Sequence, residues 1–116
     1  MATLRTPEGE QKYQDYIKAG GLDNGCPLCR DTARKTFTYW KIVSNDFPYD
    51  RVAGAHDMVV PLRHITEHEL TAEELEELRE IKHSYINDTY DYVIEAVYKK
   101  KSIPKHFHLH LVTLKE

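Results

Sequence analysis

Three histidines alternate with apolar residues near the end of this chain, in the segment His106-Phe107-His108-Leu109-His110-Leu111-Val112. Successive side chains of a β-strand point to opposite faces, so a strand here would place all three imidazoles on one face. The apolar side chains would then face a core, which holds the strand rigid. Imidazole acts as a nucleophile, acid, base or metal ligand near neutral pH. The segment therefore predicts a fixed row of reactive groups on a sheet.

A pair of thiols lies near the other end of the chain. Cys26 and Cys29 are the two cysteines of the sequence and form a C-x-x-C pair. In a reducing compartment, such a pair favours metal or redox chemistry over a structural disulfide. Asp23-Asn24-Gly25 before the pair and Pro27 within it are turn formers, which predicts a small loop that carries both thiols.

Length and composition restrict the class of protein. The 116 residues fit one domain, and the 41% hydrophobic and 30% charged fractions are typical of a globular protein. The net charge of -3 makes a nucleic-acid partner unlikely on electrostatic grounds. The polar N-terminus predicts no secretory signal, and no apolar run approaches the length of a membrane span. We therefore expect a cytoplasmic protein with no membrane partner.

The elements that must position these residues are readable from local signals. Thr6-Pro7-Glu8 predicts the start of a helix and Gly20-Gly21 predicts its end. β-Branched and aromatic residues predict strands over residues 36–44 and 56–61. A capping box at Thr71-Ala72-Glu73-Glu74 predicts the start of a longer helix. Because these elements do not repeat as βαβ units, we expect an α+β fold with an antiparallel sheet.

The segment over residues 90–98 fits two interpretations. Its apolar residues recur at helical spacing and are Tyr90, Val93, Ile94, Val97 and Tyr98. This unbroken period predicts that the helix continues to about Lys100. Several of these residues are β-branched, so a short strand stays open as the alternative. Pro104 ends either element and leads into a final strand over residues 106–114.

Three motifs together resemble one known family. The His106-x-His108-x-His110 segment with its apolar pair resembles the signature of the histidine triad (HIT) superfamily. Upstream, His56-Asp57-Met58-Val59-Val60-Pro61-Leu62-Arg63-His64-Ile65 resembles the family segment His-x-apolar-Val-apolar-Pro-Lys-Arg-His. The Cys26-x-x-Cys29 pair is the third match, in the same order and at similar spacing. The likeness extends from about Cys26 to Val112.

The resemblance implies a fold for the whole chain. It implies one HIT-like domain over residues 1–116, with an N-terminal helix and cysteine knuckle over 1–35 and the HIT core over 36–116. In this fold an antiparallel sheet carries the site, and one long helix precedes the final catalytic strand. The resemblance also implies a homodimer.

The resemblance further implies a nucleotide hydrolase or nucleotidyl transferase that acts on the α-phosphate of a nucleotide ester, anhydride or phosphoramidate. His108 would attack phosphorus and form a covalent nucleotidyl-histidine. Its attacking nitrogen must carry no proton, so we expect the other ring nitrogen to donate to a backbone carbonyl. His110, and His106 as a further candidate, would donate to the phosphate oxygens as charge develops there.

The loop before the triad departs from the family pattern. Many members have a Gly-Gln-Ser type loop that assists the leaving group, whereas this chain has Lys101-Ser102-Ile103-Pro104-Lys105. Ser102 keeps a hydroxyl at a different offset from the triad, and Lys101 and Lys105 are candidates to contact substrate phosphates instead. The segment Asn45-Asp46-Phe47-Pro48-Tyr49 resembles the ribose-side loop of some members, so Asn45 is a further candidate for substrate binding.

Zinc is the implied cofactor. Some HIT-like proteins bind zinc through residues that correspond here to Cys26, Cys29, His64 and His106. Such a Cys2His2 set forms a closed tetrahedral site, which is structural rather than catalytic. It would remove His106 from direct contact with phosphate. A nucleotide-binding or zinc-stabilised interaction module with little turnover therefore stays open as an alternative to the enzyme.

Overall fold

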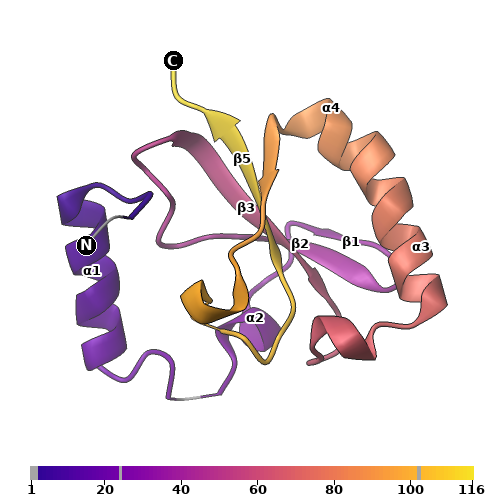
Figure 1. Cartoon of the computed structure of the whole chain (residues 1–116), viewed down its shortest axis with the longest axis horizontal. Helices are drawn as coiled ribbons and strands as arrows, with labels where there is room; N and C mark the ends of the chain where they lie inside the picture. Colours follow the sequence, from indigo (N-terminus) through magenta and orange to yellow (C-terminus); the bar gives the residue numbers. More distant parts are fainter. Residues whose placement is uncertain (1–2, 24, 102) are drawn as a thin grey trace.

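A five-stranded antiparallel sheet forms the centre of the molecule (Figure 1). The computed structural model describes residues 3–23, 25–101 and 103–116. The strands are β1 (Lys35–Thr36), β2 (Trp40–Ser44), β3 (Ala53–Pro61), β4 (Tyr92–Ile94) and β5 (Leu109–Leu114). Their spatial order is β1-β2-β3-β5-β4, so the strand that follows the first two triad histidines lies between two others. The expected α+β fold with an antiparallel sheet is confirmed.

The register of β5 fixes where each side chain points. Met58 of β3 lies opposite His110, and the neighbouring Asp57 lies opposite Leu111. A bulge between Ala53 and Ala55 adjusts the register near the end of this pairing. Since side chains alternate along a strand, this register sends His110 to one face of the sheet and Leu111 to the other.

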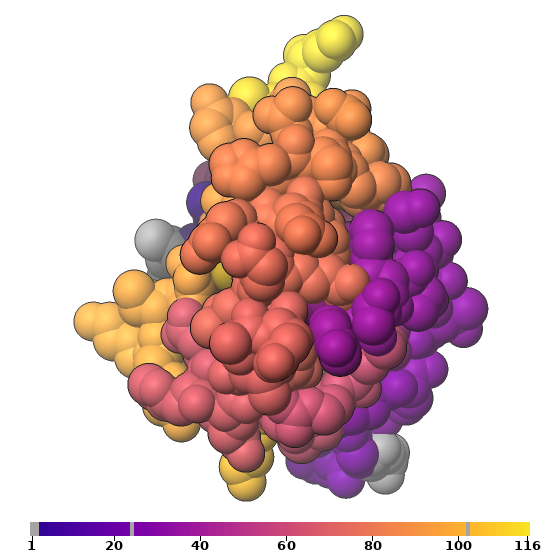
Figure 2. All heavy atoms as spheres, turned by 90° about the vertical axis from the view of Figure 1, so that its right-hand side faces the viewer, coloured from indigo at the N-terminus to yellow at the C-terminus, as the bar shows by residue number. Residues whose placement is uncertain are grey.

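The two faces of the sheet bury two separate cores. On one face Trp40 and Ile42 of β2 pack with Leu109 and Leu111 beneath the long helix. Figure 2 looks onto this helix, which covers much of that side of the molecule. On the other face a smaller core forms from Leu28, Val43, Met58 and Val60. The predicted separation of histidines from apolar residues is confirmed, because Phe107, Leu109 and Leu111 join the first core.

Helix α1 (Pro7–Lys18) begins and ends as its sequence predicts. The Thr6 hydroxyl accepts a hydrogen bond from the Gly9 backbone N–H at 3.1 Å, and Pro7 occupies the first turn. Gly20 follows the helix with a φ of +85°, a conformation that favours glycine. Asp50 ties this helix to the rest of the chain, since its carboxylate accepts from the Thr6 N–H at 2.7 Å and from the Thr6 hydroxyl at 3.0 Å.

The long helix has the predicted start. Thr71 and Glu74 form the capping box, with reciprocal hydrogen bonds of 3.1 and 2.9 Å. A short 3₁₀ turn, η1 (Glu67–Glu69), precedes it. The helix then runs for 18 residues through α3 (Ala72–Ile81), the π-helical turn η2 (Lys82–Ile86) and α4 (Asn87–Thr89).

The expectation that this helix continues to about Lys100 is wrong. The chain leaves the helix after Thr89, and Tyr92–Ile94 pairs with β5 as strand β4. The Asp91 N–H donates to the carbonyl of Val112 at 2.9 Å, which starts this pairing. The local period of this β-branched segment fits a helix. The segment forms a strand because the open edge of β5 offers it a partner for pairing. Beyond it lies the 3₁₀ turn η3 (Tyr98–Lys100).

The boundaries of three strands also differ from the prediction. Strand β3 begins at Ala53 rather than at residue 56. The strand expected over residues 36–44 is divided, because the Phe37 N–H donates to the Trp40 carbonyl at 2.7 Å and closes a turn between β1 and β2. The final strand begins at Leu109 rather than at residue 106. Before it, the Phe107 N–H donates to the Ile65 carbonyl at 2.7 Å, in the loop that follows β3.

No helix within the described ranges has the length and apolar character needed to cross a membrane.

Candidate functional site

His108 and His110 line a cavity on the face of the sheet opposite the long helix. One wall comes from α1 and from the loop after β2. The other comes from the segment that joins β4 to β5. Besides the two histidines, the lining residues include Tyr13, Tyr16, Asn45, Phe47, Tyr49, Met58, Ala96, Lys100, Lys101 and Ile103. The cavity therefore combines an aromatic wall, a floor with two imidazoles and a basic wall.

His108 has a fixed protonation pattern. Its Nδ1 lies 2.9 Å from the backbone carbonyl oxygen of His106, which can only accept, so Nδ1 carries the proton. Nε2 is then left with a free lone pair. The side chain is only 7% exposed, and burial lowers the pKa of His108. The expected backbone acceptor is confirmed, and the role of His108 as nucleophile stays a prediction.

The protonation of His110 is set through a chain of hydrogen bonds. The backbone N–H of Tyr49 donates to His56 Nδ1 at 2.9 Å, so neutral His56 carries its proton on Nε2. This Nε2 lies 2.9 Å from His110 Nδ1, which must then accept. His110 consequently carries its proton on Nε2, which lies 3.1 Å from the Tyr49 hydroxyl. His110 is thereby prepared to act as a hydrogen-bond donor.

Burial keeps both of these imidazoles neutral. It lowers the pKa of His56 to about 4, and the positive charge of Arg5 lowers it further while Asp57 opposes the shift. Burial and the neighbouring His108 and His56 lower the pKa of His110 to about 2. Tyr49 was not predicted as a site residue, although it lies in the loop that resembles the ribose-side segment.

Asn45 lines the cavity, and its side chain braces the loop after β2. Its Oδ1 accepts from the Phe47 backbone N–H at 2.8 Å. This orients its Nδ2 toward the buried side, where it lies 3.3 Å from His56 Nε2 and 4.0 Å from the sulfur of Met58. Asn45 thus fixes the backbone of the loop at Phe47, and its contact with substrate stays a prediction.

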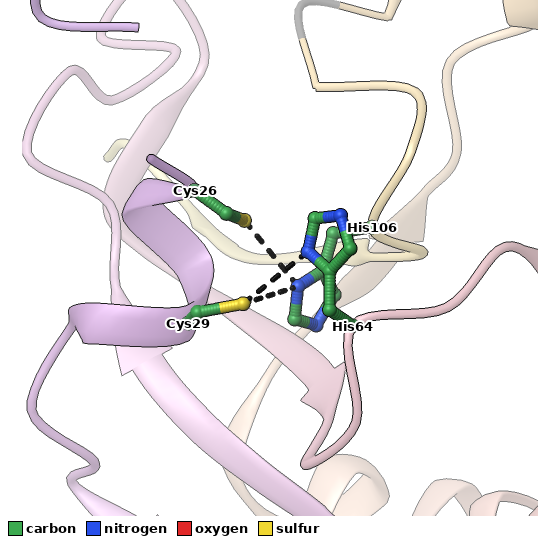
Figure 3. A group of neighbouring side chains, drawn as sticks. All are labelled: Cys26, Cys29, His64 and His106. Atoms are coloured by element: carbon green, nitrogen blue, oxygen red, sulfur yellow. Dashed lines mark hydrogen bonds between the residues drawn. The ribbon is translucent and has the colours of Figure 1, made fainter. Parts of the chain in front are cut away.

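Cys26, Cys29, His64 and His106 form a second group, and Figure 3 shows their side chains pointing toward one another. Their ligand atoms all lie within 4.8 Å of one another. His106 Nδ1 lies 3.4 Å from each sulfur, and His64 Nδ1 lies 3.3 Å from Cys29 Sγ. Ordinary zinc bond lengths in a tetrahedron separate a sulfur from a nitrogen by about 3.6 Å, close to these values.

The donor set fits a metal ion in its chemistry as well as its spacing. His106 is fully buried, and its Nε2 lies 3.0 Å from the Pro61 carbonyl, to which it donates. This hydrogen bond leaves Nδ1 unprotonated and directed at the thiols, as a metal ligand requires. Burial raises the pKa of the Cys29 thiol, and a bound cation would reverse that shift. The four residues therefore form a possible Cys2His2 metal site.

Local interactions hold the elements of this group in place. Cys26 precedes the short helix α2 (Pro27–Arg30), whose Leu28 is buried in the smaller core. The ammonium of Lys41 donates to the carbonyls of Cys29 and Asp31 at 3.4 and 3.2 Å, which fixes the end of that helix. The N-terminal third of the chain, the loop after β3 and the segment before β5 thus bring their four ligand atoms together at one point.

The remaining predicted residues fall into three groups. His106 faces the cysteines and is absent from the cavity wall, so its direct contact with phosphate stays a prediction. Lys105 lines a separate hollow beside Cys26 and His64, whereas Lys101 lines the histidine cavity. Ser102 lies outside the described residues.

A comparison with protein-family models finds no match for this chain, and no curated protein matches its sequence.

Proposed function

We propose that this chain belongs to the HIT superfamily and hydrolyses or transfers a nucleoside monophosphate group through His108. The observation that carries the proposal is the pairing of two fixed tautomers in one cavity. His108 has a free lone pair on Nε2, and neighbouring His110 has a proton on Nε2. A nucleophile beside a hydrogen-bond donor is the combination that attack on a phosphate ester requires.

The proposed reaction has two steps. The Nε2 lone pair of His108 forms a bond to the α-phosphorus, and the bond to the leaving group breaks with its electron pair on that group. Water or another acceptor then attacks the phosphorus of the nucleotidyl-histidine and loses a proton to the solvent, and the electron pair of the N–P bond returns to Nε2. In both steps the His110 N–H donates to a phosphate oxygen in place of the Tyr49 hydroxyl.

The aromatic wall supports a nucleoside as the carried group. Tyr16 and Tyr13 pack on the ring of Phe47 with centroid separations of 4.8 and 5.2 Å. Aromatic faces of this kind favour stacking with a base, and the amide of Asn45 lies nearby in the same loop. The nucleoside would therefore lie against α1, and its phosphate would contact the two histidines.

We propose zinc as the ion held by Cys26, Cys29, His64 and His106. A closed set of two thiolates and two imidazoles gives the ion a structural role. His106 would then act on the chemistry through its backbone, because its carbonyl accepts the Nδ1 proton of His108.

Trapping of the covalent adduct tests the proposed function. Protein mixed with an adenosine phosphoramidate or a dinucleoside polyphosphate should release the nucleoside monophosphate. Mass spectrometry after an alkaline denaturing quench, which spares the acid-labile N–P bond, should detect the nucleotidyl adduct. His108→Ala should lose both signals. His83→Ala is the matched control, since His83 is exposed on the long helix. Equal release by the His108→Ala protein would contradict the assignment.

A nucleotide-binding or zinc-stabilised interaction module with little turnover is the second candidate. The observation that favours it is the hydrogen bond between His110 Nε2 and the Tyr49 hydroxyl. In the free protein this hydroxyl already accepts the proton that a phosphate would need. Tight nucleotide binding without release, in both the original chain and His108→Ala, would establish this alternative.

A further inference from the structure

Lys101 forms part of the cavity wall and is unusually buried for a lysine. Only 11% of its side chain is exposed. Its Nζ lies 3.6 Å from Glu95 Oε2 and 5.4 Å above the centroid of the Phe107 ring. The contact with Glu95 is an ion pair, but its length exceeds that of a normal hydrogen bond and the Glu95 side chain is 42% exposed, so the ammonium keeps donor capacity toward the cavity. A buried ammonium is costly unless anions satisfy it, so this wall is suited to bind a second one.

Lys101 lies in the same cavity as the two histidines that we assign to the chemistry, because its side chain lines a wall of the cavity whose floor holds His108 and His110. Lys101 comes from the segment between β4 and β5, whereas the aromatic wall comes from α1 and the loop after β2. A nucleotide with its base against the aromatic wall directs its leaving group to the wall that holds Lys101, Lys100 and Ile103.

We propose that Lys101 binds the leaving group and selects substrates in which that group is an anionic phosphate. This inference rests on the proposed function. When the His108 Nε2–P bond forms, the P–O bond to the bridging oxygen breaks and its electron pair stays on that oxygen. A phosphate leaves as an anion without taking up a proton, and the Lys101 ammonium stabilises the added charge. A phosphoramidate instead releases an amine, which needs a proton and gains nothing from a nearby cation.

Paired substrates test this specificity. The values of kcat/KM are measured for diadenosine triphosphate and for an adenosine phosphoramidate with Lys101→Gln, which is one bond shorter, keeps an N–H donor and loses the charge. We expect a loss of about 10-fold or more for the anhydride, the usual effect of a charged hydrogen bond, and little change for the phosphoramidate. Lys101→Arg should recover most of the anhydride activity. Lys99→Gln is the matched control, since Lys99 is exposed outside the cavity wall.

An equal loss for both substrates, or none for either, overturns the assignment of Lys101. Failure of the proposed function gives a different result, because the original chain would then turn over neither substrate. In that case calorimetric affinities for ADP and AMP decide the role of Lys101. A loss of about 10-fold in Lys101→Gln for ADP alone supports binding of the second phosphate, and equal changes for both nucleotides overturn it.

Discussion

At the scale of single residues, a backbone N–H determines the protonation of the site. The Tyr49 N–H is a donor under all conditions, so its bond to His56 Nδ1 fixes the proton positions on His56 and then on His110. Sequence patterns predicted that His108 would donate to a backbone carbonyl. They did not predict this second chain of bonds, because it depends on a loop and two strands that meet only in the folded protein.

His56 should make the stability of the protein depend on pH. The pKa of His56 is about 4 in the folded protein and near 6.5 in the unfolded chain. Between pH 4 and pH 6.5, the unfolded chain therefore binds a proton that the folded chain does not. The free energy of unfolding therefore falls as the pH drops from about 6.5 to 4. At about 1.4 kcal/mol per pKa unit, His56 alone lowers it by about 3 kcal/mol over this range.

Urea unfolding at several pH values measures this effect. The slope between pH 6.5 and 4 should be shallower in His56→Gln than in the original chain, and His83→Gln should keep the full slope because that side chain is exposed. Identical slopes in all three proteins would rule out the contribution of His56.

The Tyr49 hydroxyl should compete with a phosphate for the proton on His110 Nε2. Tyr49→Phe removes this acceptor, so we expect tighter binding of AMP together with a loss of about 1 kcal/mol in the free energy of unfolding. Calorimetry and urea unfolding measure the two effects. Weaker AMP binding in Tyr49→Phe would indicate instead that the hydroxyl contacts the ligand.

At the scale of elements, local signals predicted where the two helices begin and where the final strand lies, but favoured a helix where strand β4 forms. The proline after Thr6 and the capping box at Thr71 act through neighbouring residues, and both helix starts are where they were expected. The segment Tyr92–Ile94 depends on the open edge of β5, a partner that local periodicity does not reveal. The same limit applies to Lys101, whose burial results from how the segment after β4 folds back.

The metal group should stabilise the contact between α2 and the segment before β5. Zinc bound only to the folded chain adds its binding free energy to stability, so a chelator should lower Tm by more than about 10 °C. Cys26→Ser should bind much less zinc and should show little response to the chelator. His68→Gln is the control, because His68 is exposed and lies outside the group. Equal and negligible zinc in all three proteins would refute the metal assignment.

Helix α1 should contribute to ligand binding through its first turn. Thr6 caps the helix and also binds Asp50, so Thr6→Ala should lower the free energy of unfolding by about 1 kcal/mol or more. Because α1 carries Tyr13 and Tyr16 of the cavity wall, AMP should also bind more weakly. Lys12→Ala, an exposed change on the same helix, should alter neither quantity.

At the scale of the whole molecule, the edge strand β4 favours the homodimer that the resemblance implies. No described strand pairs with its outer edge. Large apolar side chains are exposed in and after it, among them Tyr92 and Val97, and Tyr98 is 75% exposed. An open edge with exposed apolar residues favours pairing with another chain, and a second copy supplies the same edge.

Light scattering after size-exclusion chromatography tests this expectation. The original chain should have twice the 13.6 kDa mass of one copy, and Tyr98→Lys should shift it toward the single mass. Leu75→Lys, which changes an exposed apolar residue on α3, should keep the dimer. A single mass for the original chain would contradict the prediction.

The register between β3 and β5 has a consequence for how inactive molecules would arise. A slip of one residue would turn every side chain of β5 to the opposite face, so leucines would enter the cavity and His110 would enter the core. Such a molecule would keep its helices and sheet while losing its chemistry. The fraction of competent molecules would then vary between preparations with the same circular dichroism spectrum, and active-site titration, rather than a measure of folding, would count them.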